Sequence, residues 1–303
     1  MRQSFIRVVA VILAASSMAL ASAANTFADT PSSTSSGTLT MTSDAGDYLG
    51  QGRQFSFATP QDTMSVGGGP HGFGANIADS AGMSNWWLHF EMPLDQTLAP
   101  GVYADAQLVA DETHPGMSIE GEYRGCGTGT VGSFTVLAAE FGPYGYLKHI
   151  HATFEHHCDG AAAALRGELD AYAPTPPPPI EVHVTLDDEA GLDRSDGKVT
   201  LHGTVACSTL IVAHVNASIS QQTKKGPASA ASDVLYIPEC SPTPQRWETT
   251  LRSSTAARFG PGTLQATADA QVMDDWYSAW WQNNPVIYAT DQAQKTVALN
   301  PGT

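Results

Sequence analysis

The sequence predicts an all-β protein with two antiparallel β-sandwich domains joined by a proline-rich linker. Three observations support this fold class. Apolar and polar residues alternate with a period of two over many short segments, as in strands that bury one face. Five prolines fall within residues 174–179, where neither a helix nor a central strand can continue. The four cysteines lie two on each side of that segment.

The first 23 residues have the pattern of a secretory signal peptide. Arg2 and Arg7 precede an apolar run at 8–15, and Ala21-Ser22-Ala23 supplies the small residues before a cleavage site. A transmembrane anchor is the alternative interpretation, but the apolar run is short and serines interrupt it. We therefore expect export, with the mature protein periplasmic or secreted and not inserted in a membrane.

The mature chain divides at the proline run. We expect a flexible Ser/Thr-rich leader at 24–42, a β-sandwich domain at 43–172 and a linker at 173–179. An immunoglobulin-like β-sandwich is expected at 180–303, since about seven short strands and little helical periodicity are typical of that fold.

Alternation and turn residues locate the individual strands. In the first domain they are expected at 37–42, 53–58, 63–66, 86–91, 101–108, 117–123, 133–141, 147–158 and 165–171. In the second they are expected at 180–186, 199–207, 211–220, 234–238, 246–251, 263–272 and 286–299. Aromatic residues spaced four apart predict a short helical insertion at 274–283.

The cysteines predict structural disulfides. Four cysteines permit three connectivities, and the linker makes Cys126–Cys158 and Cys207–Cys240 the simplest of them. A bridge closing a loop of this size stabilises a fold by roughly 3–4 kcal/mol. No Cys-x-x-Cys spacing occurs, which argues against a metal site at the cysteines.

The charge balance argues against nucleic acid as a partner. Without the signal peptide the chain has 12 basic and 30 acidic residues, a net charge of −18, and 24–172 alone carry −13. Nucleic acids and anionic membranes need clustered Lys and Arg.

Several segments resemble known exported modules. Residues of about 40–172 resemble a recurrent module of secreted bacterial proteins, through Ser43–Gly50, Trp86–Leu88, Pro100–Tyr103, Arg124-Gly125-Cys126, Gly132–Leu137 and Phe154–Gly160. Residues of about 180–300 are loosely similar to a family of exported, disulfide-bonded, immunoglobulin-like domains, through Leu201–Cys207, Cys240 and Trp247. Neither family carries an assigned activity, so the resemblance implies bacterial export and a β-fold and supplies no catalytic residues.

A histidine-rich strand is the candidate metal site. Alternation puts His149, His151, Glu155 and His157 on one face and Cys158 on the opposite, core face. Imidazoles two apart on a strand suit Zn²⁺ or Cu²⁺, although a solvated polar face explains the same pattern without a metal, and no cofactor is the expectation.

Enzyme signatures are weak. Glu120 and Glu122 are expected on the same face of one strand, at a spacing that suits a glycosidase pair. Acidic sandwiches commonly offer such pairs. The Gly-rich segment 67–74 is expected to be a mobile turn, and the acids of 187–197 a solvated loop. No nucleophile elbow, zinc-protease or P-loop motif is present.

Aromatic rings give the remaining candidate. Four aromatic residues lie beside acids and amides, namely Trp276, Tyr277, Trp280 and Trp281. This combination suits sugar stacking or a protein interface. In the alternative interpretation, two of the rings plug the end of the sandwich. Of the pair Trp86-Trp87, one ring is expected in the core and one outside. We expect a non-catalytic binding protein for a glycan or a surface protein. The alternatives are an extracellular hydrolase with paired carboxylates and a periplasmic metal-binding protein.

Overall fold

The computed structural model describes residues 34–279 and 286–301, and it confirms an all-β chain with two sandwiches, each with its own sheet and its own hydrophobic core. The predicted signal peptide at 1–23 lies outside the described residues, as do Trp280 and Trp281. In the described part of the chain, no helix is both long and apolar enough to span a bilayer.

The first domain contains eleven strands joined in one hydrogen-bonded sheet, in the order β2-β1-β11-β10-β9-β6-β7-β5-β4-β3 with β8 on β7. The strands are β1 (Ser36–Ser43), β2 (Gln54–Ala58), β3 (Thr63–Gly69), β4 (Gly72–Ala78), β5 (Asn85–Glu91), β6 (Gly101–Gln107), β7 (Gly116–Gly121), β8 (Arg124–Gly125), β9 (Val131–Phe141), β10 (Leu147–His157) and β11 (Leu165–Tyr172). Two 3₁₀ turns, η1 (Pro143–Gly145) and η2 (Cys158–Gly160), flank β10.

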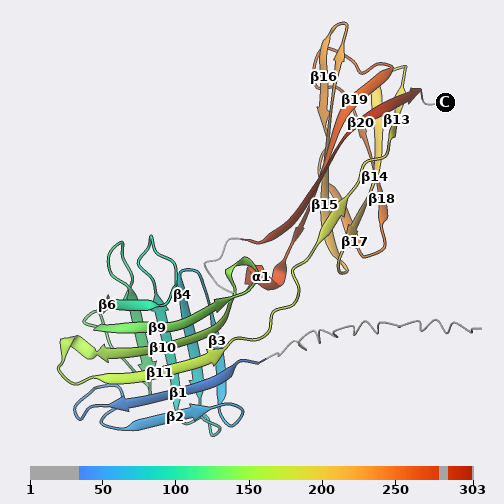
Figure 1. The fold of residues 1–303 in the computed structure, drawn as a ribbon. Helices are drawn as coiled ribbons and strands as arrows, with labels where there is room; N and C mark the ends of the chain where they lie inside the picture. Colours follow the sequence, from blue (N-terminus) through green and yellow to red (C-terminus); the bar gives the residue numbers. More distant parts are fainter. Residues whose placement is uncertain (1–33, 280–285, 302–303) are drawn as a thin grey trace, which may run out of the picture. The chain divides into compact units, whose positions relative to one another are not determined.

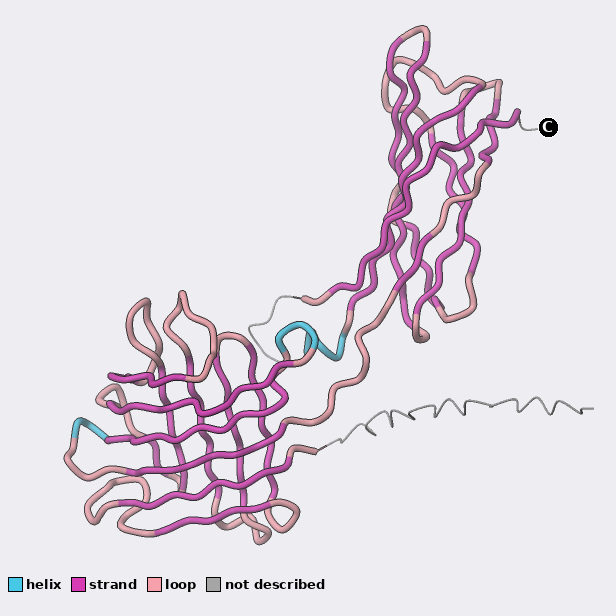
Figure 2. The backbone as a smooth tube through the Cα atoms, viewed as in Figure 1, coloured by secondary structure: helices cyan, strands magenta, loops and turns pink. Residues whose placement is uncertain are grey.

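This sheet folds over on itself, so that β3 contacts β1 and β10. Figures 1 and 2 show the strands of one half crossing those of the other. Aromatic side chains contribute to the packing between the halves. Phe90 of β5 stacks on Phe73 of the neighbouring β4 at 4.6 Å, and its ring lies 5.8 Å from that of Phe154 on β10 in the other half. Trp86 is fully buried and Trp87 is 41% exposed, which confirms the prediction for this pair.

The second domain contains nine strands, in the order β12-β14-β13-β20-β19-β15-β16, with β17 on β15 and β18 on β14. They are β12 (Val182–Val184), β13 (Glu189–Asp193), β14 (Lys198–Cys207), β15 (Ile211–Thr223), β16 (Gly226–Ala231), β17 (Leu235–Cys240), β18 (Gln245–Leu251), β19 (Gly262–Met273) and β20 (Tyr288–Pro301). The short strand β13 pairs antiparallel with β14 and parallel with β20, and so joins the two layers.

Both predicted disulfides are confirmed. Cys126–Cys158 links the end of β8 to η2 with Cα atoms 5.4 Å apart, and Cys207–Cys240 links the ends of β14 and β17 with Cα atoms 5.5 Å apart. Each bridge lies within one domain, because both of its cysteines lie on the same side of the linker segment 173–181, which carries neither helix nor strand.

Three sequence predictions need correction. The leader does not extend to position 42, because the strand predicted at 37–42 is present as β1, which begins at Ser36 and pairs with β2 and β11. The Gly-rich segment is not a mobile turn but the β3–β4 hairpin, in which Gly67 to Gly69 pair with Gly72 to Gly74. The acidic segment is only partly a loop, because Glu189–Asp193 is strand β13. Within the helical insertion predicted at 274–283, Asp275–Ala279 form helix α1, and residues 280–283 lie outside the described residues.

The second core depends on close contact at Gly203 of β14. A Cβ atom there would lie 1.9 Å from the carbonyl oxygen of Thr185 and 2.6 Å from the Trp247 ring. We expect Gly203→Ala to destabilise the second domain by about 1–3 kcal/mol through overpacking. Urea unfolding followed by fluorescence measures the change.

The matched control is Gly191→Ala on the neighbouring strand β13, where a Cβ atom would make only ordinary contact with Thr200 at 3.7 Å. This variant should unfold at nearly the wild-type urea concentration. Equal effects of the two substitutions would contradict the packing argument.

Candidate functional site

The β5–β7–β8 part of the first sheet carries an open groove of about 540 Å³. Trp87 on β5 is directly opposite Glu120 on β7, and Glu120 is opposite Gly125 on β8. These three positions therefore form one row across the outer face of the sheet. The groove is lined by Asn85, Trp87, Glu120, Gly121, Glu122, Tyr123, Arg124, Gly125, Cys126 and Gly127, and we call it the Trp87–Tyr123 groove.

A two-residue turn forms one wall of this groove. Glu122 and Tyr123 connect β7 to β8, and both have left-handed backbone, with φ of 55° and 62°. Hairpin turns with two positive φ values usually hold Asn-Gly, Asp-Gly or Gly-Gly, because a side chain makes this conformation costly. Tyr123 is nevertheless 98% exposed. The fold therefore holds a large aromatic side chain in solvent on a strained backbone.

Gly121 positions the turn. A Cβ atom at this residue would lie 2.2 Å from the buried Trp86 ring, so only glycine allows β7 to pack here. Trp86 in turn is fully buried, while its neighbour Trp87 faces the groove. The turn and the Trp87 ring are thus fixed by the same core contact.

Glu122 is held by two neighbouring side chains. Its predicted position on a strand needs correction. It lies beyond the end of β7, where Arg53 Nη2 donates to Oε2 at 2.8 Å and Ser84 Oγ donates to Oε1. Burial pushes the pKa of Glu122 upward, but the hydrogen bonds from Ser84 and Arg53 outweigh it, so the pKa lies below its ordinary value. Glu122 is therefore ionised near neutral pH and accepts hydrogen bonds.

The predicted metal-binding histidines are engaged with carboxylates. His149 Nε2 lies 2.8 Å from Asp170 Oδ1 and its ring stacks on Tyr172, and His151 Nε2 lies 2.7 Å from Glu168 Oε1. His149 is buried rather than part of a solvated face. Within residues 34–279 and 286–301, these side chains do not gather three ligand atoms around one point.

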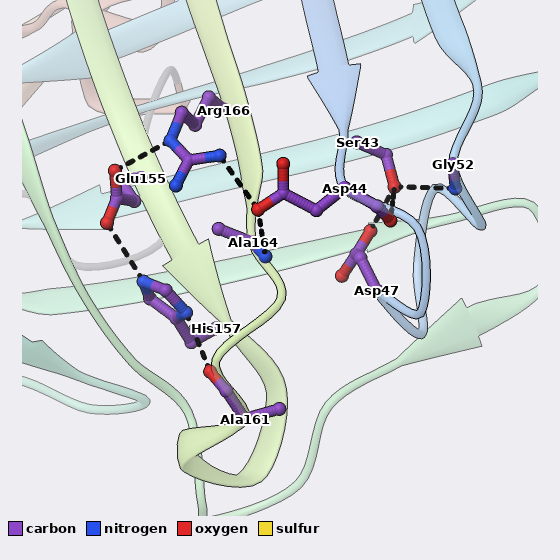
Figure 3. A network of polar contacts seen from close by, with 9 residues as sticks. All are labelled: Ser43, Asp44, Asp47, Gly52, Glu155, His157, Ala161, Ala164 and Arg166. Carbon is purple, nitrogen blue, oxygen red and sulfur yellow. Dashed lines mark hydrogen bonds and ion pairs between the residues drawn. The ribbon is translucent and has the colours of Figure 1, made fainter.

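Glu155 and His157 belong to a separate network, shown in Figure 3. Arg166 on β11 donates to Glu155 Oε2 at 2.8 Å and to Asp44 Oδ2 at 3.0 Å. His157 Nε2 lies 3.0 Å from Glu155 Oε1, and its Nδ1 lies 2.8 Å from the Ala161 carbonyl oxygen. The network fixes the loop after β1 to the β10–β11 hairpin.

The loop after β1 has a second anchor. Asp47 Oδ2 accepts a hydrogen bond from Ser43 Oγ at 2.8 Å, and Ser43 Oγ accepts one from the Gly52 amide (Figure 3). Asp47 Oδ2 also accepts from the Gly50 amide at 2.7 Å. The side chain of Asp47 is buried. This loop is a sequence segment that the resemblance singled out, and its acids are used to shape it.

The core face of β10 holds a group that the sequence analysis missed. In the described part of the chain, one cluster brings three potential ligand atoms within 4.8 Å of one another, and it contains Cys126, His156 and Cys158. His156 is fully buried, and burial lowers its pKa to about 4, so the imidazole is neutral. Alternation alone would have found it, since His156 shares the parity of Phe154 and Cys158.

The predicted aromatic cluster does not offer all its rings to a ligand. Tyr277 is 3% exposed, and its ring lies 5.0 Å from that of Tyr144 and 4.8 Å from that of Trp276. Its hydroxyl donates to the Pro177 carbonyl oxygen at 2.8 Å. Tyr277 therefore does not present its ring to solvent, whereas Trp276 is partly exposed.

Of the predicted groups, the structure brings Trp87, Glu120 and Glu122 together, with Tyr123 and Asn85 added. Tyr123 was missed because exposure of a turn residue depends on the backbone conformation of that turn.

No protein-family model and no curated protein sequence matches this chain.

The network of Figure 3 predicts a loss of stability in acid. Hydrogen bonds from Arg166 and the Ala164 amide lower the pKa of Asp44, and those from His157 and Arg166 lower the pKa of Glu155. A lowered folded-state pKa stabilises the fold above the unfolded pKa of about 4, and this contribution is lost as the pH falls through the folded value. Arg166→Gln should therefore destabilise the protein more at neutral pH than in acid.

Urea midpoints measured at neutral pH and near pH 3 check this expectation. Arg246→Gln is the control, because it removes a surface ion pair with Asp187 (2.7 Å) from the other domain. An equal deficit for Arg166→Gln at both pH values would mean that the carboxylates contribute nothing through their charge.

Proposed function

We propose that this chain is an exported, non-catalytic binding protein whose Trp87–Tyr123 groove recognises a glycan at the cell surface. The single observation that carries the proposal is Tyr123, a 98% exposed ring on a left-handed turn beside an exposed tryptophan. The two disulfides suit a compartment outside the cytoplasm, and the signal-peptide pattern supports export.

The chemistry of the groove suits a sugar. The C–H faces of a pyranose pack on flat aromatic rings such as those of Trp87 and Tyr123, and its hydroxyls need donors and acceptors nearby. Asn85 offers both, Glu120 offers acceptors and Arg124 offers donors. Tryptophan and tyrosine are also among the residue types most enriched at the positions that dominate binding energy in protein interfaces.

The backbone strain supports a ligand-binding role. A non-glycine residue with left-handed backbone costs on the order of 1–2 kcal/mol, and strain of this kind concentrates at functional sites. Tyr123 is almost fully exposed, so burial of its ring does not offset the cost within the chain. A ligand that covers the ring supplies the missing contact.

Charge narrows the class of glycan. The first domain is strongly acidic, with a net charge of −13 over 24–172, and Glu120 faces the groove. Anionic polysaccharides would be repelled. Neutral sugars and amino sugars are the classes that fit.

The hydrolase alternative has less support. Glu122 shares the groove with Glu120, but both of its carboxylate oxygens accept hydrogen bonds from Arg53 and Ser84, so this carboxylate is engaged in holding the turn rather than directed at a substrate or a water. We therefore expect binding without turnover.

Binding is tested on an array of neutral, amino-sugar and anionic glycans with the mature chain. We expect neutral or amino-sugar glycans to bind, and Trp87→Ala and Tyr123→Ala each to weaken binding about tenfold or more. Tyr236→Ala is the matched control, since this tyrosine is 62% exposed in the second domain. Retained binding in both groove variants would exclude this groove, and capture of a surface protein instead would favour a protein ligand.

A stability measurement separates a binding role of Tyr123 from a structural one. Tyr123→Gly removes the side chain that makes the turn costly, so the free energy of unfolding should stay unchanged or rise by about 1 kcal/mol while glycan binding is lost. Thermal and urea unfolding provide the measurement. A clear loss of stability would show that the ring supports the fold.

A further inference from the structure

The cluster at the end of β10 has the composition of a metal site. Its three ligand atoms, the sulfurs of Cys126 and Cys158 and a ring nitrogen of His156, lie within 4.8 Å of one another. In this structure the two sulfurs form a disulfide. Two thiolates and one imidazole are a ligand set that Zn²⁺ binds with tetrahedral geometry.

His156 is the observation that a disulfide alone does not explain. The residue is 0% exposed, and neither ring nitrogen has a hydrogen-bond partner among the described residues. A buried polar group without a partner costs on the order of 1–3 kcal/mol. Its neighbours on the same face of β10 are the apolar Ala152 and Phe154, so a leucine would avoid this cost. The imidazole lacks the partner that would account for its place.

A buried carboxylate adds to the preference for a cation. Asp47 is 3% exposed, and its Oδ1 atom has no hydrogen-bond partner among the described residues, although Oδ2 accepts from Ser43 and Gly50. Burial lowers the pKa of His156, and the interaction with the Asp47 carboxylate acts in the opposite direction. A cation beside His156 would be attracted by Asp47, whereas an anion would be repelled.

We propose that reduction of the Cys126–Cys158 disulfide creates a Zn²⁺ site formed by the two cysteine sulfurs and His156. A dithiol reductant supplies two electrons and two protons, breaks the S–S bond and leaves as a cyclic disulfide. Zn²⁺ then displaces the two thiol protons and binds two thiolates and the neutral imidazole. Water completes the fourth position.

The two disulfides of the chain differ in exposure and in their neighbours. Cys126 is partly exposed at the rim of the groove, so a reductant reaches its bridge, while Cys207 and Cys240 are 2% and 0% exposed. In the part of the chain that the structure describes, the Cys207–Cys240 pair is not part of a comparable cluster with an imidazole. Metal binding should therefore follow the first pair alone.

Co²⁺ titration of the full mature chain tests the site. The protein is reduced with a phosphine under argon and titrated with Co²⁺, whose thiolate complexes absorb in the near ultraviolet, and Zn²⁺ is then added as competitor. We expect one equivalent of Co²⁺ to bind the reduced chain, none to bind the oxidised chain, and Zn²⁺ to displace it. His156→Phe should weaken binding by at least about tenfold.

Two matched variants serve as controls. His157→Gln changes the adjacent imidazole on the opposite face of β10, and Cys207→Ala/Cys240→Ala removes the other disulfide; both should retain the site. Cys126→Ala/Cys158→Ala should abolish it. Far-ultraviolet circular dichroism follows the fold, and a reduced chain that has lost structure should regain it with Zn²⁺.

Three results would overturn the proposal. They are a reduced chain that binds no Co²⁺, binding that His156→Phe leaves unchanged, and a reduced chain that unfolds and does not recover with Zn²⁺.

Discussion

The alternation of side chains along β10 is the constraint on which the first domain depends. Successive residues of a strand point to opposite faces, so one eleven-residue strand supplies both the core and the outer surface. The inner set, from Ile150 to His156, packs against the other half of the folded sheet. The outer set pairs with the acids and Arg166 of β11, and through Arg166 it fixes the loop after β1.

The same strand explains why the candidate sites are distinct. The Figure 3 network uses Glu155 and His157 to hold a loop, so these side chains serve the fold. His156 faces the opposite side, next to the disulfide, and its ring nitrogens make no hydrogen bond to the described residues. The Trp87–Tyr123 groove lies on β5, β7 and β8, and Cys126 at its rim is the residue that it shares with the cysteine–histidine cluster.

The groove shows how a fold can hold an unfavourable local feature. Gly121 allows β7 to pack against Trp86, and the β7–β8 pairing then leaves only two residues for the turn. Arg53 and Ser84 hold Glu122 in this turn from two other segments. The strain at Tyr123 is thus sustained by contacts distant in sequence, and it keeps the aromatic ring in solvent.

The sequence by itself determined the all-β class, the division at the proline run and both disulfide pairs, because strand period, proline stereochemistry and cysteine spacing are local or nearly local properties. It also determined that one of Trp86 and Trp87 would be buried. Only the tertiary structure decided that the glycines of 67–74 form a hairpin, since strand pairing supplies hydrogen bonds that glycine composition does not reveal. It also decided which carboxylates meet which histidines, because the pairing of β10 with β11 joins residues about twenty positions apart. The exposure of Tyr123 and the isolation of His156 are likewise tertiary, since both depend on what neighbouring strands place beside them.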